Sequence, residues 1–109
     1  MNLMKLQELK GHDVYEFSYA ENGLNNWNQN SLFLSTEDFS LLSTYLDKVF
    51  DDYNYYGPQK VKLEDWKKVK KVYELSKETH ESITKFFIEI DKWLENKNDL
   101  YDYFWILGV

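Results

Sequence analysis

The chain has 109 residues, of which 43% are apolar and 18% aromatic, and its formal net charge is −6. This composition excludes an intrinsically disordered chain and is sufficient for the core of one domain spanning residues 1–109. Because there is no cysteine, disulfides and thiolate metal sites are excluded, and two distant histidines predict no metal centre and no cofactor. The start lacks a signal peptide and no stretch approaches the roughly 20 apolar residues of a membrane span, so we expect a cytoplasmic protein without membrane contact.

The charge is distributed unevenly along the chain. Residues 1–59 carry three lysines and nine acidic residues, a net charge of −6, whereas residues 60–77 carry seven lysines and three acidic residues, a net charge of +4. All 13 basic residues are lysines, so the chain lacks the planar guanidinium group that binds phosphate in a bidentate manner. An acidic half repels nucleic acid and attracts a basic partner. We therefore expect no nucleic-acid partner. The lysines of residues 67–71 are expected to form a solvated helix face, and nucleic-acid binding through them is the alternative.

The first elements predict a β-hairpin. Apolar and polar residues alternate over residues 14–19, which is typical of a half-buried strand, and residues 31–35 form the returning strand. The asparagine-rich residues 21–30 supply the connecting loop. Within it, Trp27 is expected either to fold back as a lid on the core or to be displayed as a contact residue. Residues 1–11 predict a helical turn or a short strand, and the pattern does not choose between them.

Three further helical segments are indicated. The first begins with a cap at Ser35 or Thr36 and runs to about Asp52, before Gly57 and Pro58 break any helix. Apolar spacing over residues 63–94 then allows one long helix, but we favour two helices or a sharp kink near residues 76–80. His80, in that region, is predicted to be a hydrogen-bonded histidine at the core or its edge. The most strongly amphipathic stretch is 82–94, whose apolar stripe must be covered by the other elements; the stripe consists of Ile83, Phe86, Phe87, Ile90, Trp93 and Leu94.

The last ten residues, 100–109, predict a strand with large apolar side chains on both faces, as expected for a central position in the sheet. The predicted fold is therefore a small single α+β domain, with an N-terminal β-hairpin, two or three helices and a C-terminal strand that joins the sheet of the hairpin.

No pattern in the sequence predicts catalysis. There is no glycine-rich phosphate loop, no nucleophile elbow and no cysteine nucleophile, and adjacent acidic residues on a helix diverge rather than converge on a metal. We therefore expect a protein that is not an enzyme.

The most unusual patch combines acidic and aromatic residues just before Gly57. Tyrosine provides a large contact area at low entropic cost, and acidic residues accelerate encounter with a basic surface. We call residues 51–56 the acid–tyrosine segment, and predict that partner binding involves this segment and nearby acidic residues. The predicted partner-binding residues are Asp47, Asp51, Asp52, Tyr53, Tyr55, Tyr56, Glu64 and Asp65.

The residues Tyr55-Tyr56-Gly57, followed by Leu63 and Trp66, resemble a segment of the barstar-type ribonuclease inhibitors. In size, acidity and aromatic content the chain also resembles bacterial toxin-immunity proteins. In the barstar family, the segment leads from a loop into a helix and carries acids that occupy the basic active site of the ribonuclease. The resemblance implies that Glu64 and Asp65 take this role.

We therefore expect an immunity or antitoxin-like protein that binds and occludes a basic bacterial toxin, possibly a nuclease. The alternative is a structural or regulatory module that self-associates through its aromatic surface without a toxin partner. The sequence does not indicate the oligomeric state.

Overall fold

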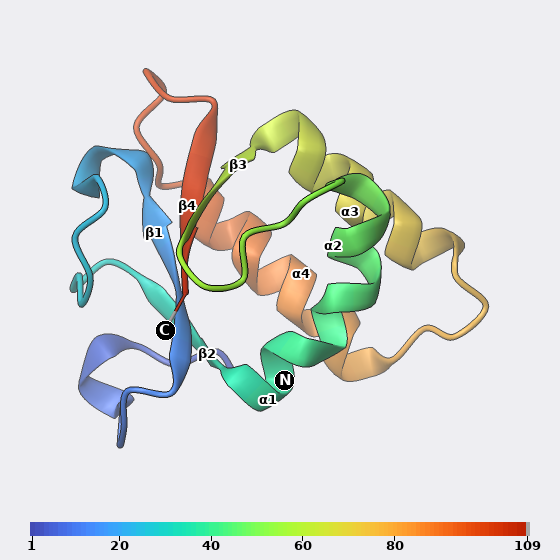
Figure 1. Ribbon diagram of the computed structural model, residues 1–109, viewed down its shortest axis with the longest axis horizontal. Helices are drawn as coiled ribbons and strands as arrows, with labels where there is room; N and C mark the ends of the chain where they lie inside the picture. Colours follow the sequence, from blue (N-terminus) through green and yellow to red (C-terminus); the bar gives the residue numbers. More distant parts are fainter. Residues whose placement is uncertain (109) are drawn as a thin grey trace.

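The computed structural model describes residues 1–108, so Val109, at the end of the predicted strand 100–109, lies outside the described residues. The chain forms a small α+β domain in which a four-stranded antiparallel sheet is covered on one face by helices (Figure 1). The strands are β1 (Val14–Tyr19), β2 (Leu32–Ser35), β3 (Pro58–Lys62) and β4 (Tyr103–Leu107), in the spatial order β2-β1-β4-β3. The helices are α1 (Thr36–Phe39), α2 (Ser43–Val49), α3 (Leu63–Leu75) and α4 (Glu81–Leu94).

The predicted hairpin, the central C-terminal strand and the fold class are confirmed. β1 pairs with β2 on one side and with β4 on the other, and β3 adds a further strand at the far edge of β4. β3 lay outside the sequence prediction, because its five residues carry a single buried side chain, Val61. For residues 1–11 the sequence left a helical turn or a short strand open. The structure has a 3₁₀ turn, η1 (Leu6–Glu8), and a single β-bridge from Met4 to Phe33.

The core lies between the inner face of the sheet and the helices. The Phe17 side chain, fully buried in β1, contacts the rings of Phe39, Trp66, Phe86 and Phe104, so one residue touches α1, α3, α4 and β4. The apolar stripe of 82–94 faces this cluster as predicted, with Ile83, Phe86, Phe87, Ile90 and Trp93 buried. Aromatic pairs in such tilted and edge-to-face arrangements add to the stability that burial alone provides.

The helix predicted over residues 36–52 is wrong in its length and continuity. The structure has α1, then a 3₁₀ turn, η3 (Ser40–Leu42), then α2, which ends at Val49. Ser40 and Ser43 donate side-chain hydrogen bonds to the carbonyls of Glu37 and Ser40, at 2.6 and 2.7 Å, and such bonds to carbonyls within the helix bend or tighten it. At the N-terminus, the Ser35 hydroxyl accepts a hydrogen bond from the Asp38 amide, as the predicted cap requires.

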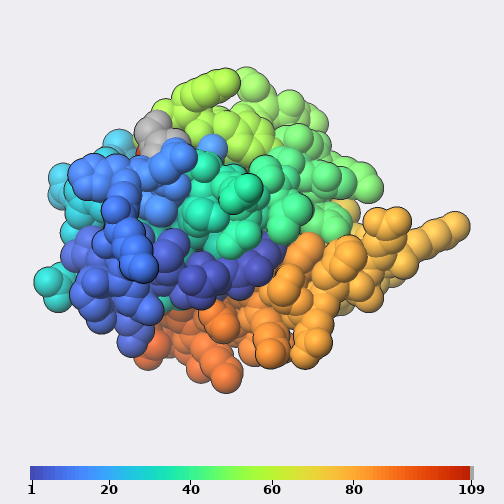
Figure 2. All heavy atoms as spheres, turned by 90° about the horizontal axis from the view of Figure 1, so that it is seen from below, coloured from blue at the N-terminus to red at the C-terminus, as the bar shows by residue number. Residues whose placement is uncertain are grey.

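Residues 63–94 form two helices, as favoured by the sequence. Ser76 leaves the helical conformation, and its hydroxyl donates to the carbonyl of Tyr73 at 2.6 Å. The Tyr73 hydroxyl accepts from the His80 amide at 2.8 Å and donates to the His80 carbonyl at 2.7 Å, which holds the two ends of the turn together. The turn projects from the body of the molecule as the gold tip in Figure 2. His80 itself is exposed, and among residues 1–108 its imidazole forms no hydrogen bond, so the predicted hydrogen-bonded histidine is wrong.

A second layer covers the outer face of β1. The η2 turn (Ala20–Asn22) and the loop that follows it pass over this face, and Glu16 and Ser18 are therefore buried on the side where the alternating pattern predicted exposure. Figure 1 shows this loop and the η1 turn on the side of the sheet opposite to the helices. Consequently, both faces of the central strand β1 are buried.

Two leucines five positions apart, Leu41 and Leu46, test the packing of the α1–α2 region. Leu46 is fully buried and Leu41 is 50% exposed. We expect Leu46→Ala to lower the free energy of unfolding by about 2–5 kcal/mol, because it leaves a cavity in the core. Leu41→Ala should change it by less than about 0.5 kcal/mol. Urea denaturation of both variants provides the comparison, and equal effects would contradict the assigned burial.

The stability should also fall at alkaline pH. Tyr19 donates a hydrogen bond of 2.6 Å to the Trp93 carbonyl, and burial, followed by the charge of Glu21, raises the pKa of Tyr19 to about 12. Its ordinary value is about 10, so the neutral hydroxyl is favoured in the folded state; its contribution is complete below pH 10 and is lost as the pH rises towards 12. Tyr19→Phe should show a shallower loss of stability between these pH values in urea titrations.

Candidate functional site

The acid–tyrosine segment connects α2 to β3, and one of its aromatic side chains, Tyr56, is exposed to solvent. Tyr53 is buried in the core cluster, Tyr55 is partly buried, and Tyr56 is 92% exposed. Asp51 and Asp52 are exposed in the turn that follows α2. Of the three predicted tyrosines, Tyr56 alone is almost fully exposed, while Tyr53 contributes to the packing beneath the loop.

Several hydrogen bonds hold the segment in place around Tyr56. The Asn54 side-chain oxygen accepts from the Tyr56 amide at 3.3 Å, and the side-chain oxygen of Gln59 accepts from the Asn54 amide at 2.8 Å. The Gly108 amide, at the end of β4, donates to the Gly57 carbonyl at 3.2 Å. A Cβ atom at residue 108 would lie 2.7 Å from the Tyr55 carbonyl oxygen, so this close approach requires glycine. The exposed ring is therefore carried on a braced backbone.

Tyrosine hydroxyl groups connect the segment to the elements beneath it. The Tyr55 hydroxyl donates to the Asp47 carboxylate at 2.7 Å, and the Tyr15 hydroxyl donates to the Tyr55 carbonyl at 3.1 Å. Burial first, and then the hydrogen bond to Asp47, raises the pKa of Tyr55; burial, and then the neighbouring Tyr56 and Asp13, raises the pKa of Tyr15. Both hydroxyls thus remain neutral donors at physiological pH.

These contacts define a surface larger than the predicted segment. We call Asp13, Tyr15, Asp47, Asp51, Asp52, Tyr55 and Tyr56 the acid–tyrosine surface. Asp13 and Tyr15 are about 40 positions earlier in the chain and were missed. The fold brings the Tyr15 hydroxyl to the Tyr55 carbonyl, and both Asp13 and Tyr56 lie near enough to Tyr15 to raise its pKa. Asp47, Asp51 and Asp52 form no ion pair within residues 1–108, so the surface keeps its negative charge.

Glu64 and Asp65 lie away from the tyrosines. They occupy the first turn of α3, where acidic residues stabilise the helix dipole, and Asp65 lies 3.8 Å from the Lys68 ammonium group. The extended strand β3 separates this turn from Gly57 by five residues, or about 16 Å. Figure 1 shows the loop and the start of α3 at opposite ends of β3. The structure therefore does not bring these two carboxylates together with Tyr56.

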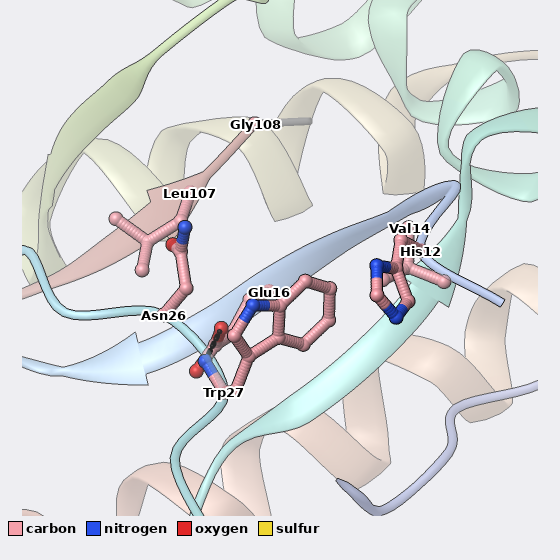
Figure 3. Close-up of a pocket in the computed structure, with 7 residues that line it drawn as sticks. All are labelled: His12, Val14, Glu16, Asn26, Trp27, Leu107 and Gly108. Carbon is pink, nitrogen blue, oxygen red and sulfur yellow. Dashed lines mark hydrogen bonds between the residues drawn. The ribbon is translucent and has the colours of Figure 1, made fainter. Parts of the chain in front are cut away.

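A pocket of about 250 Å³ opens on the outer face of the sheet next to this surface (Figure 3). Its lining consists of His12, Val14, Glu16, Asn26, Trp27, Leu107 and Gly108. Gly108 is also the residue that contacts Gly57, so the pocket and the acid–tyrosine surface adjoin. The Trp27 ring stacks on Phe33 with centroids 6.0 Å apart and lies 4.9 Å from the His12 ring. Trp27, 42% exposed, thus both covers the sheet and remains accessible.

Glu16 fixes the wall of this pocket. One carboxylate oxygen, Oε1, accepts from the Trp27 amide at 2.7 Å. The other, Oε2, accepts from the Asn28 amide, the Asn28 side chain and the Ser31 hydroxyl at 2.6–3.0 Å. Trp27 has a φ angle of 65°, a left-handed conformation uncommon for a large side chain, and the bond to Glu16 helps to hold it there. Glu16 was missed because the alternation of β1 predicted a solvated position.

Comparison with known proteins gives no further guide to the site: no protein-family model, curated protein or solved structure matches the chain. Within residues 1–108, no group of three or more histidine, cysteine or acidic side chains is arranged to hold a metal ion. In the same range no helix is long and apolar enough to cross a membrane. The site is therefore described by its own geometry, which is that of a charged and aromatic surface beside a pocket.

Replacing the Glu16 carboxylate should loosen the loop over the outer face. In Glu16→Gln, one oxygen acceptor becomes an NH₂ donor that faces other donors, and we expect a loss of about 1–3 kcal/mol of unfolding free energy. Hydrogen exchange at the amides of Trp27 and Asn28 should accelerate more than exchange in α3.

The matched control is Glu21→Gln, an exposed acidic residue of the same loop, which should change the stability by less than about 0.5 kcal/mol. Unchanged exchange at Trp27 in Glu16→Gln would show that the carboxylate does not hold this loop.

Proposed function

We propose that the chain is an immunity protein that binds a basic bacterial protein toxin, of the nuclease class, and occludes its active site. The observation that carries this proposal is the display of Tyr56, 92% exposed on a braced loop that also carries Asp51 and Asp52, whose carboxylates form no ion pair within residues 1–108. A ring held in place before binding loses little conformational freedom in the complex, so more of its contact energy contributes to affinity. A tyrosine that becomes buried against a partner is typical of a binding hot spot.

The negative charges favour a basic partner. Residues 1–59 have a net charge of −6, and Asp13, Asp47, Asp51 and Asp52 from this half belong to the acid–tyrosine surface. Carboxylates on a binding surface accelerate association with a positively charged partner. A nuclease active site is such a surface, because it must attract phosphates. In this mechanism, the carboxylates take the place of substrate phosphates, while Tyr56 packs at the rim of the cleft.

The exposed edge of β3 does not favour the alternative, self-association. β3 is an edge strand, where free backbone groups could pair with another copy. Pro58 has no amide hydrogen, the Asn54 side chain donates to the Pro58 carbonyl at 3.3 Å, and the Gln59 side chain donates to the Lys60 carbonyl at 3.0 Å. These side chains occupy acceptors that a second strand would need, and the lysines at positions 60 and 62 add repulsion between copies.

The experiment begins with capture by the immobilised chain from a lysate of its native host, followed by elution in high salt and mass spectrometry. We expect a basic protein that is toxic when expressed alone and harmless when co-expressed with this chain. Recovery of the chain itself alone, with concentration-dependent sedimentation, would replace the proposal by self-association.

Variants then test the surface with the captured protein. Tyr56→Ala should weaken the complex at least tenfold, equivalent to about 1.4 kcal/mol or more, without lowering stability. The double variant Asp51→Asn/Asp52→Asn should slow association and reduce its salt dependence. Glu74→Gln/Glu78→Gln changes the net charge equally at exposed positions of α3 and the following turn, and should have little effect. Equal effects of the two double variants would show that net charge, rather than this surface, governs binding.

A further inference from the structure

The Glu16 carboxylate is buried, since the residue is only 3% exposed. Within residues 1–108 it belongs to no ion pair. Charged groups are rarely buried unless they are paired, because the interior solvates them poorly. The hydrogen bonds are shared unequally: Oε2 accepts three, whereas Oε1 accepts one, from Trp27. A carboxylate oxygen accepts about two hydrogen bonds. Oε1 therefore retains acceptor capacity.

The pocket lined by this carboxylate combines apolar and aromatic surfaces. Val14 and Leu107 provide apolar surface from adjacent strands, and the rings of Trp27 and His12 lie beside them (Figure 3). Its volume of about 250 Å³ is below that of pockets for drug-sized ligands, so it suits a single side chain rather than a large cofactor. Lysine and arginine side chains fit this chemistry, since they combine an apolar stem with a cationic head. Indole is the aromatic ring that attracts cations best.

We propose that this pocket receives a lysine or arginine side chain of the partner protein. The stem packs against Val14 and Leu107, and the cationic head lies beside the Trp27 ring and donates to Glu16 Oε1. A neutral apolar side chain would instead remove water from around the carboxylate without compensating its charge, which is unfavourable. The inference takes from the proposed function only the basic character of the partner, and the contact of Gly108 with Gly57 makes the pocket continuous with the acid–tyrosine surface.

The test uses small probes and no partner protein. Acetyl-arginine amide and acetyl-lysine amide are titrated into the isotopically labelled chain to millimolar concentration, with acetyl-leucine amide and acetyl-glutamate amide as controls. The signals followed are the Trp27 indole and the backbone amides of Trp27, Asn28 and Gly108. We expect saturable shifts with the cationic probes, at least tenfold weaker binding of the controls, and weaker cation binding in added salt. Equal binding of acetyl-leucine amide, or no saturable shift with either cation, would overturn the proposal.

A pair of tryptophan variants locates the probe. Trp27→Asn removes the ring and keeps a residue that tolerates the left-handed conformation, so it should weaken cation binding at least tenfold, as followed at Gly108. Trp105→Ala removes a partly buried ring of β4 that does not line the pocket, and should leave binding unchanged. Equal losses in both variants would also overturn the proposal.

The result is separable from that of the proposed function. If the cations fail to bind, but Tyr56→Ala still weakens the complex with the captured protein, the pocket proposal alone is wrong. If the cations bind at Trp27 and the acid–tyrosine variants have no effect on the captured protein, the pocket stands and the proposed binding surface is wrong.

Discussion

The fold depends on the burial of Phe17 at the centre of the sheet. Its ring contacts aromatic side chains from α1, α3, α4 and β4, so a single position in β1 fixes how the sheet meets the helices. Such a position tolerates little change of volume, because the interior is close-packed. The same strand carries Glu16 on the opposite face and Tyr15 beside Phe17, so the packing of the core also determines where the pocket and the acid–tyrosine surface lie.

The sequence predicted the inner layer well because its periodicity is strong. Strand alternation around Phe17 and the helical spacing of Ile83, Phe86 and Ile90 reflect direct contact with the core. The division between α3 and α4 was also predictable, since the apolar spacing turns polar at Ser76 and His80. In these elements, burial and sequence pattern arise from the same contacts.

The outer layer was not predictable by this means. Glu16 is buried because a loop crosses above it. The hydrogen bonds that stabilise its buried carboxylate come from Trp27, Asn28 and Ser31. The alternation of apolar and polar residues in β1 carries no information about these loop donors. β3 was missed for a related reason: as an edge strand it buries only Val61, so its apolar pattern is weak. Its Lys60 instead contacts the sheet through its ammonium group, 4.1 Å from the centroid of the Tyr103 ring. The candidate site was found in part, through Tyr56 and its neighbouring acids, but the contribution of Asp13 and Tyr15 follows from the fold.

The turn between α3 and α4 offers a practical handle on this molecule. Because the Tyr73 hydroxyl bonds both the amide and the carbonyl of His80, the turn is closed at its base, while its tip is exposed and projects from the body (Figure 2). Exposed tips with closed ends are the positions at which chains accept insertions most readily. A fluorophore or an immobilisation tag placed between Lys77 and Thr79 would leave the sheet, the pocket and Tyr56 unaltered, and would present every copy to a partner in one orientation.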